Sequence, residues 1–153
     1  MKPIMDFAFQ LRAKIALDAD LAVKKGGRYF LLNENLQRLI RKDFYYAGTY
    51  LGKVKNGKFF PSFNLLTMLA KGEANKIVVD RKTAWLFVCG RDVFRRGILS
   101  VHGSRRKGDY TLVLNEFGEC LGFGKITRSL DAKETQVAVE NISDVGDFLH
   151  REV

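Results

Sequence analysis

The feature that most constrains the fold of this chain is a β-hairpin predicted around the turn Asn115–Gly118. Side chains alternate along Tyr110–Leu114, so that Leu112 and Val113 point to opposite faces of a strand. The turn residues suit a tight reversal, because Gly118 is free to adopt a positive φ. The chain then returns along Cys120–Ile126 as the second strand of the hairpin.

The returning strand carries Gly122 and Gly124 on one face, which they leave almost bare, and Leu121 and Phe123 on the other. Glycines weaken a strand, and they mark a bulge or a place where another backbone comes close. The identity of the approaching backbone is therefore a question about function.

Short apolar runs separated by glycines predict further strands in the second half of the chain. The predicted strands cover residues 84–89, 98–102, 110–115, 120–127 and 135–140. A short helix is expected at Arg91–Arg96, and a last one at Ser143–His150, capped by Ser143 or Asp144. Short strands at this spacing indicate a small β-barrel.

The first half mixes helix and strand patterns. Helices are expected at residues 5–17, after an N-cap at Asn33, and from Ser62 to Gly72. Strands are expected at residues 29–32, 44–54, 59–60 and 76–79, and Asn56-Gly57 fits a type I′ hairpin turn. The expected fold class is α+β, with an N-terminal antiparallel sheet flanked by helices and a C-terminal small β-barrel.

We place a domain boundary near Asp80–Thr83, which gives an N-terminal domain of residues 1–81 and a C-terminal domain of residues 82–153. Gly, Pro and Ser are absent at this boundary, so we expect the two halves to pack as one rigid unit. The net charge of +9 is uneven, because residues 1–80 hold 14 Lys/Arg against 7 Asp/Glu, whereas residues 81–153 hold 12 against 10. A basic chain of this kind favours a polyanionic partner.

The spacing of the cysteines and histidines and the hydropathy of the chain bear on whether it holds a metal or contacts a membrane. The two cysteines, Cys89 and Cys120, lie in apolar runs; the sequence leaves a disulfide between them open, and buried free thiols in a reducing compartment are the expected state. With His102 and His150 they show no metal-ligand spacing, so we expect no metal site. No apolar run approaches the roughly 20 residues needed to span a bilayer, and the first residues lack a signal-peptide core. We expect a cytoplasmic monomer with no membrane contact, or a nuclear or nucleolar one in a eukaryote.

Several spaced motifs of the second half resemble a PUA domain, the RNA-binding module named after pseudouridine synthases and archaeosine transglycosylases. The motifs are Gly90–Leu99, Lys107–Asp109, Asn115–Glu119 and Leu121–Gly124. The resemblance covers roughly residues 82–152. Together with Trp85, the upstream α+β half and the ending Asp144–His150, it makes the chain similar to the Nip-seven family of ribosome-biogenesis factors, in a short, archaeal-like form.

The resemblance implies a non-catalytic RNA-binding protein without a cofactor, which acts in pre-ribosomal RNA processing and large-subunit assembly. Its partners would be ribosomal or precursor RNA and other assembly proteins. The implied RNA contacts are basic residues after the Leu-Gly-Phe-Gly strand, together with the helix after the first barrel strand and the glycine that closes it. The residues are Lys125, Arg128, Lys133, Arg91, Arg95, Arg96 and Gly97. The bare face of Gly122 and Gly124 would then be a path for an RNA backbone.

Each of these residues also has a plainer explanation. Lys125 and Arg128 fit a solvated strand end, and Arg95 and Arg96 fit a basic helix C-terminus that complements the helix dipole. The run Arg105–Lys107 is typical of a solvated loop. Three tyrosines could stack on bases but more simply alternate between the core and the surface of the first sheet, and Trp85 fits a core or interdomain anchor. The tyrosines are Tyr45, Tyr46 and Tyr50.

Two other functional classes stay open. A small PUA-like enzyme acting on RNA or a nucleotide would need an acid/base set in a pocket, for example Asp109 and His102 beside a lysine. A protein-binding adaptor would dock an assembly factor on its N-terminal half.

Overall fold

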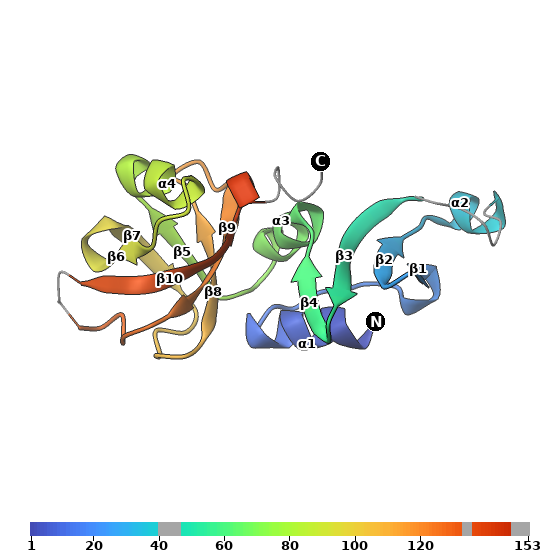
Figure 1. Ribbon diagram of the computed structural model, residues 1–153, viewed down its shortest axis with the longest axis horizontal. Helices are drawn as coiled ribbons and strands as arrows, with labels where there is room; N and C mark the ends of the chain where they lie inside the picture. The colour runs from blue at the N-terminus through green and yellow to red at the C-terminus, as the bar shows by residue number, and fades with distance from the viewer. Residues whose placement is uncertain (40–46, 133–135, 148–153) are drawn as a thin grey trace.

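A computed structural model describes residues 1–39, 47–132 and 136–147 of the chain. Two β-sheets lie side by side along the long axis, one from each half of the sequence (Figure 1). The expected α+β class, with an N-terminal antiparallel sheet and helices followed by a curled C-terminal sheet, is confirmed. In the described part of the chain, no helix is both long and apolar enough to cross a membrane.

The first sheet is a four-stranded antiparallel meander in the order β1-β2-β3-β4. Its strands are β1 (Ala22–Lys25), β2 (Arg28–Leu31), β3 (Thr49–Lys55) and β4 (Lys58–Pro61). The predicted Asn-Gly turn joins β3 to β4, and Asn56 and Gly57 have φ values of 52° and 72°. Positive φ at both positions is what a type I′ turn requires.

Three α-helices belong to this half: α1 (Lys2–Gln10), α2 (Glu34–Leu39) and α3 (Phe63–Lys71); a short 3₁₀ turn, η1, covers Ala19–Leu21. The two predicted N-caps are confirmed. The Asn33 side chain accepts a hydrogen bond from the Leu36 amide at 2.8 Å, and Ser62 accepts one from the Leu65 amide at 3.1 Å. Each side chain thus satisfies an amide that the first helical turn leaves unpaired.

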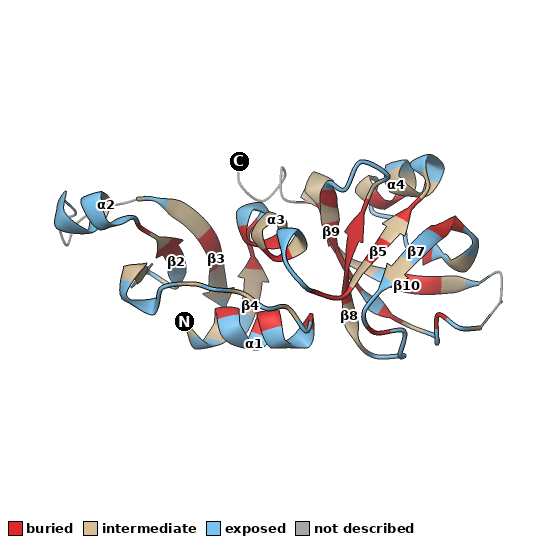
Figure 2. Cartoon of the chain, turned by 180° about the vertical axis from the view of Figure 1, so that it is seen from behind, coloured by how far each residue is buried: buried red, intermediate tan, exposed pale blue. Residues whose placement is uncertain are grey.

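The boundaries and faces of these helices were predicted less well. The helix expected at residues 5–17 is α1, which ends at Gln10, and its buried face holds Ile4 and Phe7 while Phe9 is 81% exposed. The α2 residue Leu39 is 77% exposed, because α2 lies at the outer end of the sheet (Figure 2). Ile40, Tyr45 and Tyr46 lie outside the described residues.

The second sheet has six strands in the order β6-β10-β9-β8-β5-β7, all antiparallel except the pair β5–β8. They are β5 (Lys76–Val79), β6 (Val93–Phe94), β7 (Ile98–His102), β8 (Tyr110–Leu114), β9 (Cys120–Ile126) and β10 (Val137–Asp144). The sheets thus part between β4 and β5, upstream of the expected boundary near Asp80. The division into domains of residues 1–81 and 82–153 stays a prediction.

The predicted hairpin is β8 and β9, with Gly118 at a φ of 80° in its turn. The side chains on its two faces pack in two separate hydrophobic cores. Leu112 packs in a core shared with α1, α3 and the first sheet, whereas Val113 packs in a second core under α4 (Arg81–Val88). A register shift in β9 puts Leu121 and Phe123 against different cores, so their predicted shared face is wrong.

Two elements of the second half differ in type from their prediction. Residues 84–88 of the strand expected at residues 84–89 belong to helix α4, which Cys89 ends; the Asp80 side chain caps the start of this helix by accepting a hydrogen bond from the Thr83 amide at 2.8 Å. The helix expected at Arg91–Arg96 is instead the short strand β6 and the 3₁₀ turn η2 (Arg95–Gly97). At the start of the last predicted helix, the Asp144 side chain accepts a hydrogen bond from the Asp147 amide at 2.9 Å, as an N-cap would. Residues 148–153, the rest of that prediction, lie outside the described chain.

The backbone that approaches the strand glycines is β10 of this same chain. A methyl group on Gly122 would overlap the Ser143 carbonyl, and one on Gly124 would overlap the Glu140 carbonyl. Both glycines are buried. The expected path for an RNA backbone along this face is therefore wrong, since β10 occupies it.

Candidate nucleic-acid interface

The interface begins where α4 meets η2. The Asp80 amide donates to the Gly97 carbonyl at 2.9 Å, and a side chain on Gly97 would overlap the Thr83 hydroxyl. Gly97 is therefore needed for close packing against the first turn of α4. This contact places Lys82 of α4 and Arg96 of η2 in the lining of one hollow between these two elements.

Arg95 and Arg128, which come from η2 and the segment after β9, line one small hollow. The Arg95 Nε donates to the Leu130 carbonyl at 2.9 Å, which fixes the plane of the guanidinium group. The other lining residues are Ser129, Ala132, Gln136, Val137 and Ala138. This Arg95–Arg128 hollow has a volume of about 10 Å³, room for one water, so an anion would lie across it rather than inside it.

Arg96 and Gly97 line a second and larger hollow of about 290 Å³, between η2 and the start of α4. The Arg96 guanidinium carbon stands 5.7 Å from the centre of the Phe94 ring, which is itself 41% exposed. The Arg96–Gly97 hollow is also lined by Asp80, Lys82, Thr83, Leu86 and Asp92. A flat, half-exposed aromatic ring beside a cation is a surface on which a nucleobase can stack.

The two carboxylates of this second hollow are engaged with backbone amides. The Asp80 side chain caps α4, and the Asp92 side chain accepts a hydrogen bond from the Asn141 backbone amide at 2.8 Å. Asn141 in turn donates to the Phe87 carbonyl at 2.9 Å, so this network ties β10 to the end of α4. These hydrogen bonds partly offset the negative charge of the two carboxylates. The carboxylates therefore repel a phosphate less than two carboxylates without such bonds would.

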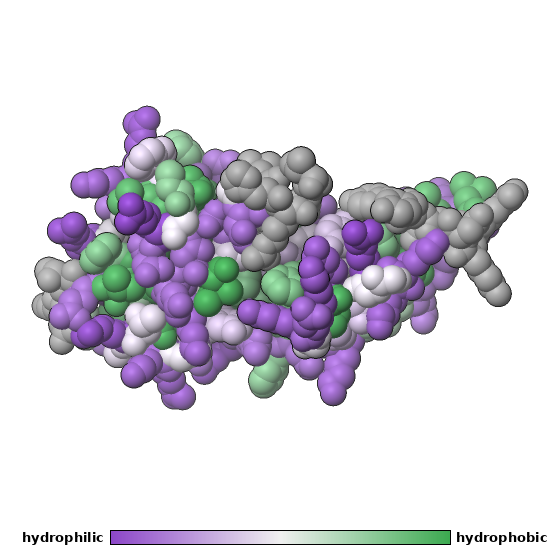
Figure 3. All heavy atoms as spheres, viewed as in Figure 1, coloured by the Kyte–Doolittle hydropathy of each residue, from purple (hydrophilic) through white to green (hydrophobic). Residues whose placement is uncertain are grey.

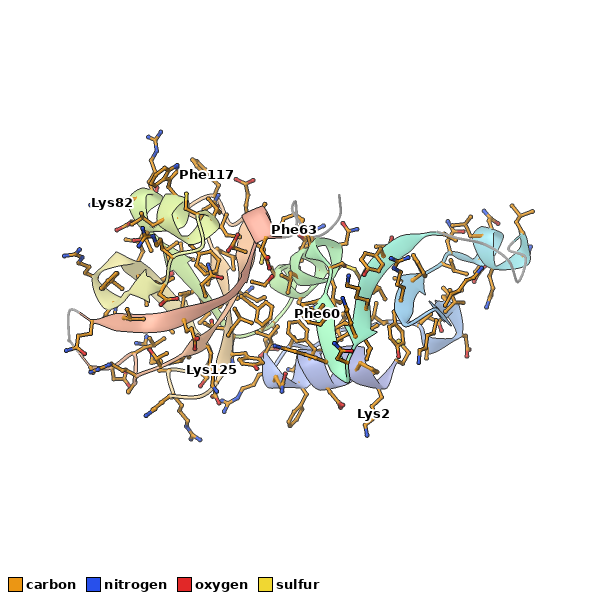
Figure 4. All side chains as sticks on the ribbon, in the orientation of Figure 1. Lys2, Phe60, Phe63, Lys82, Phe117 and Lys125 are labelled. Carbon is orange, nitrogen blue, oxygen red and sulfur yellow. The ribbon has the colours of Figure 1, made fainter. Side chains whose placement is uncertain are left out.

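The structure brings together only some of the predicted RNA-binding residues. Arg95 and Arg128 share one hollow, and Arg96 and Gly97 share the other. Arg91 is exposed just after α4 and lines neither. Lys125 is exposed on β9, opposite Tyr110 of β8 and Glu140 of β10, away from both hollows (Figure 4). Lys133 lies outside the described residues.

Other residues weighed from the sequence have the following positions. Trp85, expected as an internal anchor, is 65% exposed on α4, so that prediction is wrong. Tyr50 packs against Phe30 within the first sheet, with ring centres 5.6 Å apart. In the loop Arg105–Lys107, Arg105 pairs with Asp131 at 3.4 Å.

Asp109 is held by structural partners: its carboxylate pairs with Arg12 at 3.2 Å and accepts from the Ser104 hydroxyl. Among the described residues no group of acids, histidines and cysteines could hold a metal ion. Hydrophilic side chains cover most of the face seen in Figure 3, with hydrophobic patches among them over the second sheet.

Sequence reasoning missed Lys82, Thr83 and Phe94. A signal was available for each. Asp80 three residues before Thr83 is the spacing of an N-cap, and it would have placed Lys82 and Thr83 in the first turn of a helix. Phe94 directly precedes two arginines, a mixture of aromatic and basic residues that is typical of nucleic-acid surfaces.

Comparison with known proteins gives a consistent result. The family model described as the UPF0113 PUA domain matches residues 75–153. A UPF0113 protein of Archaeoglobus fulgidus is 31% identical over 114 residues, which are 71% of this chain and 63% of that protein. The chain thus spans less than two thirds of the length of this relative.

Solved structures share the fold. A conserved PUA domain protein from Thermoplasma acidophilum superposes with a TM-score of 0.60 at 23% identity, over 86% of this chain and 79% of that one. A hypothetical protein from Pyrococcus horikoshii gives a TM-score of 0.57 at 18% identity, over 86% and 77%. Both matches extend beyond residues 75–153 in coverage, so the similarity of fold includes part of the first half.

Proposed function

The chain belongs to the UPF0113 PUA domain family, and from this we propose that it is a non-catalytic RNA-binding protein that acts in ribosome biogenesis. PUA domains are RNA-binding modules. In this proposal the edge of the second sheet formed by η2 and the start of α4 contacts RNA phosphates. The protein is then a monomer of the cytoplasm, where its partners are ribosomal or precursor RNA and other assembly proteins.

One observation carries the RNA-binding proposal. Arg95 and Arg96 are adjacent in η2, yet each lines a different hollow, and each hollow holds a second basic residue. The second residues are Arg128 and Lys82. Four cations around one turn give a basic edge, in which Asp80 and Asp92 are the two carboxylates, and guanidinium groups bind phosphate oxygens through charge-assisted hydrogen bonds. The half-exposed Phe94, which lines the hollow of Arg96 and Lys82, adds a stacking surface.

The more specific role in ribosome biogenesis is supported by the similarity to the Nip-seven family over the second half and by the net charge of +9. The positive charge of the first half suits contact with a large, folded RNA. The role of Leu121–Gly124 in this proposal is structural, since its glycines accommodate β10.

Crosslinking of the protein to RNA in the cells that express it tests the proposed role. We expect crosslinked RNA to be enriched in large-subunit ribosomal RNA or its precursors, and the enrichment to disappear when Arg96 and Arg128 are both replaced by alanine. Crosslinking to messenger or transfer RNA instead would reject ribosome biogenesis while leaving RNA binding intact. Crosslinking to no RNA would reject both.

A further inference from the structure

A groove of about 430 Å³ runs along α1, and it shares no lining residue with the two hollows of the interface described above. Its walls come from three places: α1, the β3–β4 hairpin and the strands β8, β9 and β10. We call this the α1 groove. Its volume lies within the range of small-ligand sites, about 300–1,000 Å³.

The floor of the α1 groove is a chain of aromatic rings. Phe7 of α1 stands edge-to-face against Phe59 of β4 at 5.8 Å and against Phe123 of β9 at 5.0 Å, and Phe123 stands against Tyr110 of β8 at 5.8 Å. Phe7 and Phe123 are 5% exposed. Phe59 and Tyr110 are half-buried, so their rings are the ones that a ligand can reach.

The rim of the α1 groove is polar, and cations stand at both ends. Lys2 at the start of α1 and Lys58 on the hairpin both line the groove, and the Lys58 ammonium group stands 5.7 Å from the centre of the Phe60 ring. At the other end, Tyr110 is the cross-strand partner of Lys125, and such partners project from the same face of a sheet. Figure 4 shows Lys2 and Lys125 near opposite ends of α1.

Between these ends, Asp6 and Gln10 line the α1 groove one helical turn apart, so that their side chains are neighbours. A carboxylate accepts hydrogen bonds, and an amide both donates and accepts them. Glu140 also faces Lys125 from β10, and the neighbouring Asp109 is paired with Arg12 at 3.2 Å.

We propose that the α1 groove binds one nucleotide of a strand, with its base against Phe59 and Tyr110 and the two phosphates that flank it in the strand at Lys2 and Lys58 on one side and at Lys125 on the other. Aromatic rings take the flat face of a base, Asp6 and Gln10 take its hydrogen-bonding edge, and ammonium groups neutralise phosphate charge. The nucleotide is one residue of a single-stranded RNA whose neighbouring segment lies on the basic edge of η2, and this part of the proposal rests on the proposed function. A free mononucleotide has the same chemistry and is distinguished by the test.

The test maps backbone amide shifts of the full chain by NMR during titration with an oligouridine decamer, an oligoadenine decamer, or UMP or AMP alone. We expect a decamer to shift the amides of Gly57, Phe59, Tyr110 and Ile142. Shifts of these amides by a mononucleotide as well would identify a site that also accepts free nucleotides. If neither decamers nor mononucleotides shift them, the proposal is wrong.

Two variants with different mechanisms support the mapping. Lys2→Ala with Lys58→Ala removes charge from one end of the groove, and Gln10→Trp fills the groove without changing charge; all three positions are exposed, so we expect both proteins to fold. Each should weaken decamer binding by about five- to tenfold, the effect of losing one or two phosphate contacts or one stacked base. Lys71→Ala, an equally exposed lysine on α3 outside the groove, is the matched control and should bind unchanged.

Failure of this proposal and failure of the proposed function give different results. Decamer shifts confined to η2 and α4, with unchanged affinity in both variants, would reject the α1 groove and leave RNA binding intact. Groove shifts with a mononucleotide, but no decamer binding, would support the groove as a nucleotide site and reject the proposed function. Absence of every shift would reject both.

Discussion

Gly97 packs against Thr83 so closely that a methyl group on Gly97 would overlap the threonine hydroxyl. Thr83 lies in the first turn of α4, and the cap of that helix, Asp80, donates its amide to the Gly97 carbonyl at 2.9 Å. These two contacts join α4 to η2. The position of Lys82 relative to Arg96 therefore depends on a residue without a side chain.

Replacing Gly97 with alanine should lower the free energy of unfolding by about 1–3 kcal/mol, because the new methyl group forces α4 away from η2. Urea denaturation measures the loss as a shift of the midpoint at constant slope. Adding Thr83→Ala removes the overlapping hydroxyl and should recover part of the stability. A Gly97→Ala variant as stable as the parent protein would show that the contact is looser than described.

Replacing Gly122 with alanine should be more damaging, at about 3 kcal/mol or more, since its φ of 149° disfavours a side chain and the obstructing atom is the Ser143 carbonyl of the β10 backbone. We expect loss of β10 protection in hydrogen exchange along with the loss of stability. Gly118→Asn is the control, because a residue in this open turn has no atom within 4 Å of an added Cβ, and asparagine tolerates a positive φ. Equal effects of the two substitutions would contradict the packing of β10 on Gly122.

The two cysteines should differ in reactivity. Cys120 is buried as expected, and burial raises the pKa of its thiol to about 11, whereas the expected burial of Cys89 is wrong, since this residue is exposed at the end of α4. Because the thiolate is the reactive form and Cys120 keeps its proton until well above neutral pH, a thiol reagent at pH 8 should modify Cys89 rapidly and Cys120 only after unfolding. Counting modified thiols with and without urea tests this. Two rapidly reacting thiols in the native protein would contradict the burial of Cys120.

The sequence was most informative where local chemistry decides the structure. The turn at Asn56-Gly57 and the caps at Asn33 and Ser62 depend on neighbouring residues alone, and all were predicted. The alternation along β8 also predicted correctly that Leu112 and Val113 point to opposite faces of the strand, which in the structure belong to two different cores. Each of these signals lies within a few residues of the feature that it specifies.

The errors arose where distant contacts decide. The strand expected at residues 84–89 is the exception, because these residues are apolar enough for a buried strand and the local cap at Asp80 distinguishes the helix. The bare faces of Gly122 and Gly124 indicated a close approach, but the sequence could not identify β10 as the approaching segment. The division of the basic residues between two hollows follows from the pairing of β6 with β10, which joins segments far apart in the chain.

The central claim is that the basic edge of η2 binds RNA phosphates, and the salt dependence of RNA affinity tests it most directly. The affinity of an oligouridine decamer should fall linearly with salt on logarithmic axes. Arg96→Ala with Arg128→Ala should weaken binding at low salt and reduce the magnitude of the slope by about 1.4, the contribution of two contacts to a single strand. Arg28→Ala with Arg38→Ala removes the same charge from exposed positions of the first half and is the control. A slope reduced only in the Arg96/Arg128 variant is the predicted result, and equal slopes in the two variants would contradict the claim.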